Sequence, residues 1–342
     1  MDGQRRAFLK QIGVTGALAA AGATALTKDA GGAAGAGVGA RPAAPAMPKN
    51  MVLVTFRNGE EYCLGIRTDK GILDVKKAAR AVKSSAPTTI DELLALGDHG
   101  LSELRDRALA SGSPRLFLDD KDIAYGPCVT NPPKIICVGL NYRRHAREMA
   151  QPIPDAPVLF NKFNIALNAH QGVVRVSAVP ATEFDYEAEL VIVIGQRARD
   201  VSEAEALSYV FGYAVGNDFT ARDLQNRSTQ WMIGKTSDGF APIGPWLVTA
   251  DLVGDPNKLK IECRVNGELR QSSSTDDMVF NCAQLVSYAS ALMTLEPGDI
   301  IFSGTPEGVI AGYPPDKQVW LKPGDKLTTT IEKLGELQFT LA

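Results

Sequence analysis

The stretch "FDYEAELVIVIG", residues 184–195, predicts a β-strand that runs into the core of the protein. Side chains on a strand alternate between its two faces, so Asp185, Glu187 and Glu189 are expected to share one face. From Leu190 onward both faces are apolar, which is typical of a strand that is buried on both sides. A row of carboxylates therefore leads into the buried part of a sheet.

Like charges on a buried face are costly to desolvate, so either this face is solvated or a cation lies among the acids. Hard divalent cations such as Mg²⁺ prefer carboxylate oxygens. Glu187 and Glu189 can converge on one ion, and Asp218 is the best third ligand because it ends the short strand predicted over 213–218. The alternative interpretation is the solvated polar face of an edge strand.

The composition excludes some classes of protein. The chain has 342 residues, of which 45% are hydrophobic, so it can bury a sizeable core. A formal net charge of −3 and an aromatic content of 7% argue against a nucleic-acid partner. The five cysteines form no C-x-x-C pair, which favours buried free thiols.

The N-terminal sequence predicts an export signal. In "QRRAFLKQIGVTGALAAAGATAL" the paired Arg5 and Arg6 precede a mild apolar run, a pattern that resembles a twin-arginine signal over 1–27. The run is too short and too rich in Gly and Ala for a stable membrane span. We therefore expect a periplasmic protein.

Three further segments follow this signal. Residues 28–50 are rich in Ala, Gly and Pro, which predicts a linker. Residues 51–126 begin with a hairpin around Asn58-Gly59 and continue with two short helices, so we expect a small N-terminal α+β domain. Residues 130–342 alternate strands with a few helices but show no regular β-α-β pattern. This predicts an α+β domain built on a mixed sheet.

A second group of polar residues lies outside the acidic strand. His145 and Glu148 are three residues apart on a helix predicted over 142–150, so their side chains are neighbours. A carboxylate beside an imidazole fixes its tautomer, which suits a general base. An ordinary surface ion pair is the alternative.

Two Gly-rich loops could surround a substrate. The loop over 216–246 carries Arg222, Gln225 and Lys235, donors suited to a carboxylate-bearing molecule. The loop "SGTPEGV" adds the hydroxyl of Thr305 and glycines that permit close backbone approach. It lacks the G-K-[ST] sequence of a phosphate loop.

Seven blocks in order identify a family resemblance. They are "VGLNYRRHAREM", "PVLFNKF", "FDYEAELVIVIG", "GNDFTARDLQ", "GKTSDGFAPIGPW", "SGTPEGV" and "LKPGD". Over 134–325 they resemble the fumarylacetoacetate hydrolase family, with a weaker match from about residue 50. The resemblance implies a mixed β-sandwich or rolled-sheet catalytic domain and a homodimer. Departures such as Asn161-Lys162-Phe163-Asn164 and His170-Gln171 are expected, from the resemblance, to fall in the pocket walls and not among the metal ligands.

The resemblance also implies roles for individual residues. It implies Mg²⁺, or alternatively Mn²⁺ or Ca²⁺, as the cofactor. The implied metal ligands are Glu187, Glu189 and Asp218, the implied catalytic residues are His145, Glu148 and Lys235, and the implied substrate-binding residues are Tyr142, Arg222, Gln225 and Thr305.

The function expected from these features is metal-dependent hydrolysis of a C–C bond in 2-oxo or 2,4-dioxo acids of the acylpyruvate type. The reaction would pass through an enolate that the metal stabilises. An oxaloacetate-type decarboxylase or tautomerase, or a 2-hydroxydienedioate isomerase, is the alternative within the same chemistry. A non-catalytic periplasmic protein that binds a metal or ligand is the alternative of another class.

Overall fold

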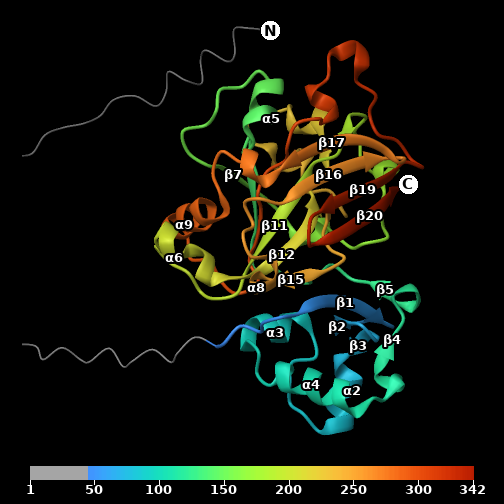
Figure 1. Cartoon of the computed structure of the whole chain (residues 1–342). Coiled ribbons are helices and arrows are strands. Elements are labelled where there is room, and N and C mark those ends of the chain that lie inside the picture. The colour runs from blue at the N-terminus through green and yellow to red at the C-terminus, as the bar shows by residue number, and fades with distance from the viewer. Residues whose placement is uncertain (1–44) are drawn as a thin grey trace, which may run out of the picture. The chain divides into compact units, whose positions relative to one another are not determined.

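The computed structural model describes residues 45–342 (Figure 1). The predicted signal over 1–27 and most of the predicted linker over 28–50 lie outside the described residues. Within 45–342, no helix combines the length and the hydropathy needed to cross a membrane.

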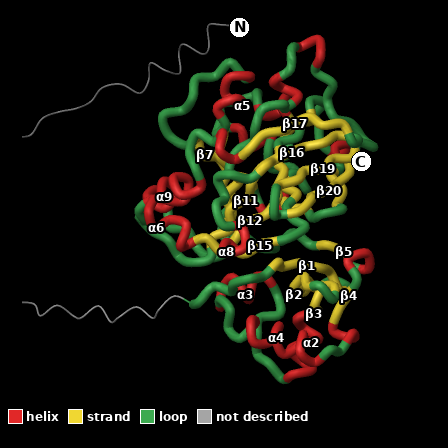
Figure 2. The backbone as a smooth tube through the Cα atoms, viewed as in Figure 1, coloured by secondary structure: helices red, strands yellow, loops and turns green. Residues whose placement is uncertain are grey.

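A mixed sheet of eleven strands forms the centre of the fold (Figures 1 and 2). In spatial order its strands are β4 (Phe117–Leu118), β3 (Gly71–Asp74), β2 (Glu61–Thr68), β1 (Val52–Asn58), β15 (Leu247–Thr249), β12 (Val210–Asn217), β11 (Ala188–Ile194), β18 (Ile300–Phe302), β6 (Ile135–Gly139) and β7 (Val158–Lys162), with β5 (Ala124–Tyr125) paired to β1. Neighbouring strands are antiparallel except β18 and β6, which are parallel. The predicted α+β class with a mixed sheet is confirmed.

A second sheet packs against β11 and β12 of the first. Its strands, in spatial order, are β17 (Glu268–Ser274), β16 (Lys260–Val265), β19 (Lys326–Ile331), β20 (Gly335–Leu341) and β9 (Gly172–Val174). Two small pairs complete the strands: β10 (Phe184–Asp185) with β13 (Thr220–Ala221), and β8 (Leu167–Asn168) with β14 (Ala241–Pro242). The two large sheets enclose much of the core between them.

Short helices connect the strands. They are α2 (Val75–Val82), α3 (Ile90–Leu96), α4 (Leu101–Ser111), α5 (Arg143–Glu148), α6 (Glu203–Ala206), α7 (Arg222–Gln225), α8 (Ala250–Val253) and α9 (Cys282–Leu292). A capping box starts α3, in which Thr89 and Glu92 each satisfy the other's backbone N–H. The helices expected near residues 89–97, 101–111 and 142–150 are present.

The strand expected over 184–195 is divided in two. β10 pairs with β13, whereas β11 pairs with β12 and β18. The division has a tertiary cause, because the Asp185 carboxylate accepts hydrogen bonds from the backbone of Ile310 and Ala311, 2.8 and 3.1 Å away. These contacts attach Asp185 to the loop around Ile310, so that Asp185 does not continue the pairing of β11.

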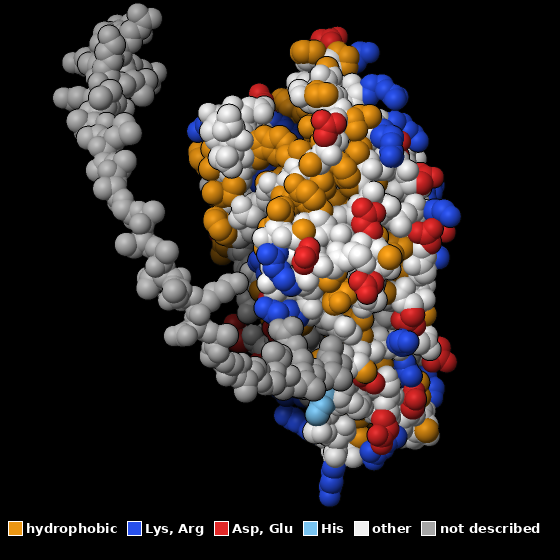
Figure 3. Space-filling model, turned by 90° about the vertical axis from the view of Figure 1, so that its left-hand side faces the viewer, with side chains coloured by type: hydrophobic (Ala, Val, Ile, Leu, Met, Phe, Trp, Pro, Cys, Tyr) orange, Lys and Arg blue, Asp and Glu red, His pale blue; other side chains and the backbone are white. Residues whose placement is uncertain are grey.

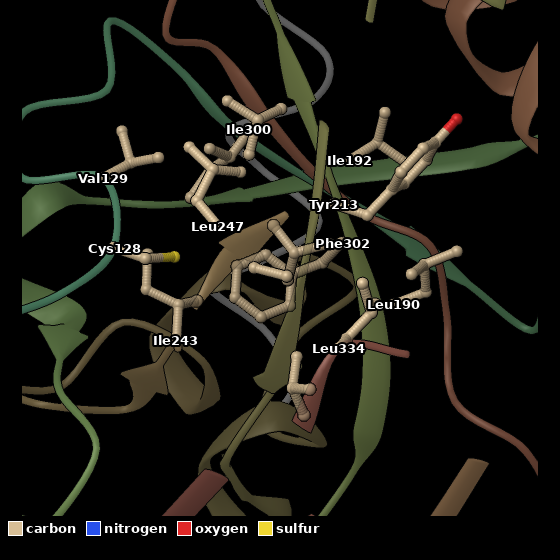
Figure 4. Packing of buried hydrophobic residues seen from close by; sticks show 14 of the residues in the cluster. Cys128, Val129, Leu190, Ile192, Tyr213, Ile243, Leu247, Ile300, Phe302 and Leu334 are labelled. Atoms are coloured by element: carbon tan, nitrogen blue, oxygen red, sulfur yellow. The ribbon is translucent and has the colours of Figure 1, made fainter. Parts of the chain in front are cut away.

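The central strands are buried on both faces, as the apolar run after Glu189 predicted. Figure 4 shows side chains from β11, β12, β15 and β18 meeting in the core, among them Leu190, Tyr213, Leu247 and Phe302. Each of these four side chains is at most 2% exposed. This packing holds the end of β11 at which the carboxylates lie.

The first segment of the described chain extends the same sheet. β1 pairs with β15 through Val52 opposite Val248 and Leu53 opposite Leu247. The N–H of Thr249 also donates to the carbonyl of Met51 at 3.1 Å. The sheet is therefore continuous across the predicted boundary near residue 126.

Candidate active site

Three buried carboxylates meet where β11 begins and β12 ends. One oxygen from each of Glu187, Glu189 and Asp218 lies within 4.8 Å of the others. The antiparallel register places Ala188 opposite Asn217, and the N–H of Asp218 donates to the carbonyl of Glu187 at 2.9 Å. The strand pairing itself thus brings together the three predicted metal ligands.

Two buried lysines contact this acidic triad. The Lys235 ammonium lies between Glu187 and Asp218; it contacts a carboxylate oxygen of Glu187 and is 2.8 Å from Asp218 Oδ2. The Lys162 ammonium is 2.6 Å from Asp218 Oδ1. Both lysines are at most 3% exposed, so their charges are compensated by these acids and not by water.

Arg222 holds the outer end of the acidic row. Its guanidinium donates to Asp185 Oδ2 at 2.9 Å, to Glu187 Oε1 at 2.7 Å and to Gln225 Oε1 at 3.0 Å. Asp185 and Arg222 therefore form a buried ion pair that positions Glu187. All three of these partners are side chains of the protein, so the main contacts of Arg222 support the acidic triad.

Glu189 differs from the other two carboxylates because it has no cationic partner among the described residues. Its Oε2 accepts a hydrogen bond from the N–H of Gly304 at 2.8 Å. Burial raises the pKa of Glu189 well above its usual value, and the charges of Asp218 and Glu187 raise it further. Burial alone would also raise the pKa of Glu187, but Arg222 and Lys235 hold it below its usual value.

The donor set fits a divalent cation. The acids Asp185, Glu187, Glu189 and Asp218 outnumber their buried cationic partners Arg222, Lys162 and Lys235 by one. Every ligand atom is a carboxylate oxygen, and an oxygen that accepts one hydrogen bond keeps a second lone pair. Hard cations such as Mg²⁺ and Mn²⁺ prefer this chemistry.

His145 and Glu148 lie together on α5, as the spacing predicted. His145 Nδ1 is 2.8 Å from Glu148 Oε1. Glu148 also accepts the N–H of Gly308, at 2.9 Å to Oε2, which fixes the carboxylate from a second side. With Nδ1 donating to the carboxylate, the Nε2 of a neutral His145 is left as a proton acceptor.

The acids, His145 and the loop residues surround one cavity of about 290 Å³. Its polar lining consists of His145, Gln151, Glu187, Glu189, Asp218, Arg222, Gln225, Asn226, Lys235 and Thr305. Apolar walls come from Val138, Met149, Phe160 and Trp231, among others. A small polar molecule that bears both carboxylate and carbonyl oxygens fits this lining better than a large apolar one.

Two of the predicted site residues do not line the cavity. Glu148 lies behind His145 and reaches the cavity only through it. Tyr142 precedes the first turn of α5, and its side chain is fully buried in the hydrophobic core. Its hydroxyl has no hydrogen-bond partner among the described residues.

The sequence pattern missed two residues that support the site. Lys162 ends β7 and is buried against Asp218, and the single charged residue in the mostly apolar block "PVLFNKF" was the available signal. Gln271 lies on β17 and contacts both the acidic strand and the loop that carries Thr305. No local pattern marks Gln271, because its partners are far away in the sequence.

Comparison with known families gives a match over most of the described chain. The family model described as "Fumarylacetoacetate (FAA) hydrolase C-terminal" matches residues 134–342. A protein of Bos taurus named "Oxaloacetate tautomerase FAHD2A, mitochondrial" is 40% identical over 84% of this chain and 90% of its own length. "Oxaloacetate tautomerase YisK" of Bacillus subtilis (strain 168) is 39% identical over 82% of this chain and 98% of its own.

Solved structures share the fold. A fumarylacetoacetate hydrolase from Exiguobacterium antarcticum superposes with a TM-score of 0.67 at 33% identity, over 85% of this chain and 99% of its own. The maleylpyruvate hydrolase from Sphingobium sp. SYK-6, in complex with manganese (II) ion and pyruvate, gives a TM-score of 0.66 at 31% identity, over 85% and 99% of the two chains. The predicted type of catalytic fold is confirmed.

The predicted periplasmic location is wrong. Relatives from cattle, frog, rat and human that match over most of both chains are named as mitochondrial proteins. The prediction rested on the paired arginines near the N-terminus, which lie outside the described residues. A short basic and apolar stretch is a weak indicator of destination when it stands alone.

Proposed function

The chain belongs to the fumarylacetoacetate hydrolase family and is an enzyme of that family, and from this premise we propose that it is a divalent-metal-dependent tautomerase of oxaloacetate or a closely related 2-oxo diacid. The observation that carries the proposal is that His145, oriented by Glu148 from behind, lines the same small polar cavity as the acidic triad. The sequence alone favoured C–C hydrolysis. The names of relatives about 40% identical over most of the chain move tautomerisation to first place.

The acidic triad would hold the cofactor. A divalent ion bound by Glu187, Glu189 and Asp218 would supply Lewis-acid stabilisation of the negative charge that develops on the 2-oxo oxygen of the substrate. We propose Mg²⁺ as the physiological ion. Mn²⁺ is the alternative, since the maleylpyruvate hydrolase structure contains it.

His145 would move the proton. In the keto form of oxaloacetate the C3–H bond breaks, its electron pair forms the C2=C3 double bond, and the 2-oxo oxygen takes the negative charge. Nε2 of His145 accepts the C3 proton while Glu148 keeps Nδ1 protonated and oriented. The same proton then passes to the 2-oxo oxygen and completes the enol.

Lys235 and Gln225 would act beside the developing oxyanion. Lys235 brings a fixed positive charge to the cavity. Because Arg222 can only donate, it binds Gln225 through the amide oxygen, and this leaves the Gln225 NH₂ group to face other partners. Fixed donors of this kind stabilise an oxyanion without reorganisation during the reaction.

The direct test follows the enol form of oxaloacetate as it converts to the keto form. The enol is dissolved in an aprotic solvent and injected into buffer that contains enzyme with Mg²⁺ or with EDTA. We expect catalysis with Mg²⁺, none with EDTA, and a loss of about 10²–10⁴-fold in kcat for His145→Gln. Metal-loaded enzyme that does not accelerate the conversion over Mg²⁺ alone would refute the proposal.

C–C hydrolysis is the second candidate, because a structure at 31% identity over 85% of this chain is a maleylpyruvate hydrolase with pyruvate bound. Pyruvate release from acylpyruvates, coupled to lactate dehydrogenase, measures it. Decarboxylation of oxaloacetate would also release pyruvate, and CO₂ release separates that reaction from tautomerisation. Cleavage of an acylpyruvate at a kcat above that for enol conversion would place hydrolysis first.

We also retain the homodimer as a proposal. Hydrophobic side chains gather on one face of the described chain (Figure 3). A groove beside the edge strand β7 is lined by Ile135, Leu159 and Phe163, and Phe163 is 53% exposed. Exposed apolar patches often mark contact surfaces. Light scattering coupled to size exclusion would give twice the chain mass of 36.5 kDa for a dimer.

A further inference from the structure

Thr305 enters the cavity wall with its hydroxyl held from behind by Gln271. The Nε2 of Gln271 donates to Thr305 Oγ1 and to the carbonyl of Pro306, at 2.9 Å in each case. The Oε1 of Gln271 accepts the N–H of Ala188 at 3.0 Å. Gln271 is fully buried on β17 and does not line the cavity itself.

The backbone partners fix which end of the Gln271 amide faces Thr305. The N–H of Ala188 can only donate, so it must face the amide oxygen. The carbonyl of Pro306 can only accept, so it must face the amide NH₂ group. This orientation follows from the partners and does not depend on telling nitrogen from oxygen in the side chain.

This orientation fixes the role of the Thr305 hydroxyl in its hydrogen bond with Gln271. Its oxygen receives a hydrogen from Gln271, so its own hydroxyl hydrogen remains to be donated elsewhere. Within residues 45–342 the hydroxyl of Thr305 has no other hydrogen-bond partner, and Thr305 lines the cavity. The hydroxyl is therefore set to donate to an oxygen of a bound molecule.

Gln271 also joins the two segments that carry the site. Ala188 lies between Glu187 and Glu189 on the acidic strand, and Pro306 follows Thr305 on the loop. On the same loop the N–H of Gly304 donates to Glu189. A single buried amide thus fixes the position of the Thr305 hydroxyl relative to the carboxylates.

The same loop approaches the backbone of β17 closely at Gly308. A Cβ atom at Gly308 would lie 2.2 Å from the carbonyl oxygen of Arg270, and the φ angle of Gly308 is 99°. Only glycine permits both the contact and the angle without strain. The loop is therefore held against the strand that carries Gln271 at Pro306 and Gly308, just after Thr305.

From these contacts we propose that Gln271 is a positioning residue, which makes the Thr305 hydroxyl an obligatory hydrogen-bond donor to a carboxylate or oxo oxygen of the substrate. The identity of that molecule as a 2-oxo acid rests on the proposed function. The positioning of Thr305 by Gln271 rests on the hydrogen bonds alone.

The test is a double-mutant cycle read out by binding. Pyruvate affinity is measured by calorimetry on the full chain with Mg²⁺ bound, for wild type, Thr305→Val, Gln271→Met and the double variant. A hydrogen bond to a charged group is worth about tenfold or more in affinity, so each single variant should bind pyruvate about tenfold more weakly. The double variant should bind as weakly as Gln271→Met alone, within about twofold, because the Thr305 hydroxyl of Gln271→Met is no longer held in its donating orientation.

Asn141 provides the matched control. Its buried amide also bridges backbone groups near the same loop, donating to the carbonyls of Ser303 and Phe280 at 2.7 and 3.0 Å, but it makes no hydrogen bond to Thr305. In an Asn141→Leu background Thr305→Val should keep its full effect on pyruvate affinity. Thr305→Ser retains a hydroxyl and should bind pyruvate within about threefold of wild type if the hydroxyl, and not the methyl group, is what matters.

Two results would overturn the proposal. In the first, Gln271→Met and Thr305→Val act independently, so that their separate losses of pyruvate affinity multiply in the double variant. The other is an unchanged pyruvate affinity in Gln271→Met. If Gln271→Met does not fold, Gln271→Leu serves instead. It removes the same amide donor without adding a charge, so unchanged pyruvate affinity there also overturns the proposal.

Binding and turnover separate this inference from the proposed function. Coupling in pyruvate affinity without any tautomerase activity would refute the proposed function and leave the role of Gln271 standing. Full tautomerase activity without coupling would refute the role of Gln271 alone.

Discussion

Replacing Lys162 by methionine should strongly destabilise the protein. The Lys162 ammonium is fully buried, 2.6 Å from Asp218 Oδ1. It also donates to the carbonyls of Phe219 at 3.0 Å, Phe240 at 2.8 Å and Lys235. Methionine fills a similar volume but leaves Asp218 without this cation and three carbonyls without this donor. Breaking a buried ion pair from one side costs about 3–5 kcal/mol.

Lys134 offers a control with the same substitution. Its ammonium is also 2.6 Å from a buried aspartate, Asp299 Oδ2, but the lysine side chain is 31% exposed. Water can reach the position of this ammonium, and Asp299 Oδ2 also accepts the N–H of Glu296 at 2.7 Å, so Lys134→Met should cost less than Lys162→Met.

The measurement is equilibrium unfolding in urea with EDTA present, so that no added metal compensates Asp218. We expect Lys162→Met to lose about 3–5 kcal/mol of unfolding free energy, with little change in the slope against urea. Equal losses in the Lys162→Met and Lys134→Met variants would refute the reasoning. A loss below about 1 kcal/mol for Lys162→Met would do the same, because it would mean that Asp218 is hydrated or protonated at no cost.

Two further predictions concern metal binding and pH. Glu189→Gln removes the carboxylate that has no cationic partner, so in EDTA the variant should melt at a higher temperature than wild type. The variant should also lose the increase in melting temperature that Mg²⁺ or Mn²⁺ gives wild type. An equal metal-induced increase in both proteins would contradict the ligand assignment. Burial lowers the pKa of His170, so below about pH 6.5, the usual histidine value, the unfolded chain binds more protons than the folded one and unfolding free energy falls as pH falls. His170→Gln should flatten that decline below about pH 6.5 in urea titrations, and parallel curves for variant and wild type would show that His170 is not its source.

The parts of the site that follow from strand geometry could be predicted from the sequence. Glu187 and Glu189 were found because side chains two apart share a face, and Asp218 because it ends the next buried strand. His145 and Glu148 were found because side chains three apart on a helix are neighbours. These rules act over a few residues, so one sequence is enough to apply them.

The supporting residues could not be predicted in this way. Gln271 is 83 residues from Ala188 in the sequence, and Lys162 is 57 residues from Phe219, so only the tertiary fold brings each pair together. The break between β10 and β11 has a similar origin, because Asp185 is held by backbone groups 125 and 126 residues away. Local periodicity contains no information about such contacts.

The pairing of β1 with β15 has a consequence for any shortened form of the chain. A protein that begins near residue 126 would lack β1, and β15 would become an open edge of the central sheet. Unpaired N–H and C=O groups on an edge strand are a template for another copy, and Leu247 and Val248 would add apolar surface there. Such a truncation is expected to aggregate even with every cavity residue intact. By pairing with β15, the N-terminal segment of the described chain is expected to prevent edge-to-edge association of the central sheet.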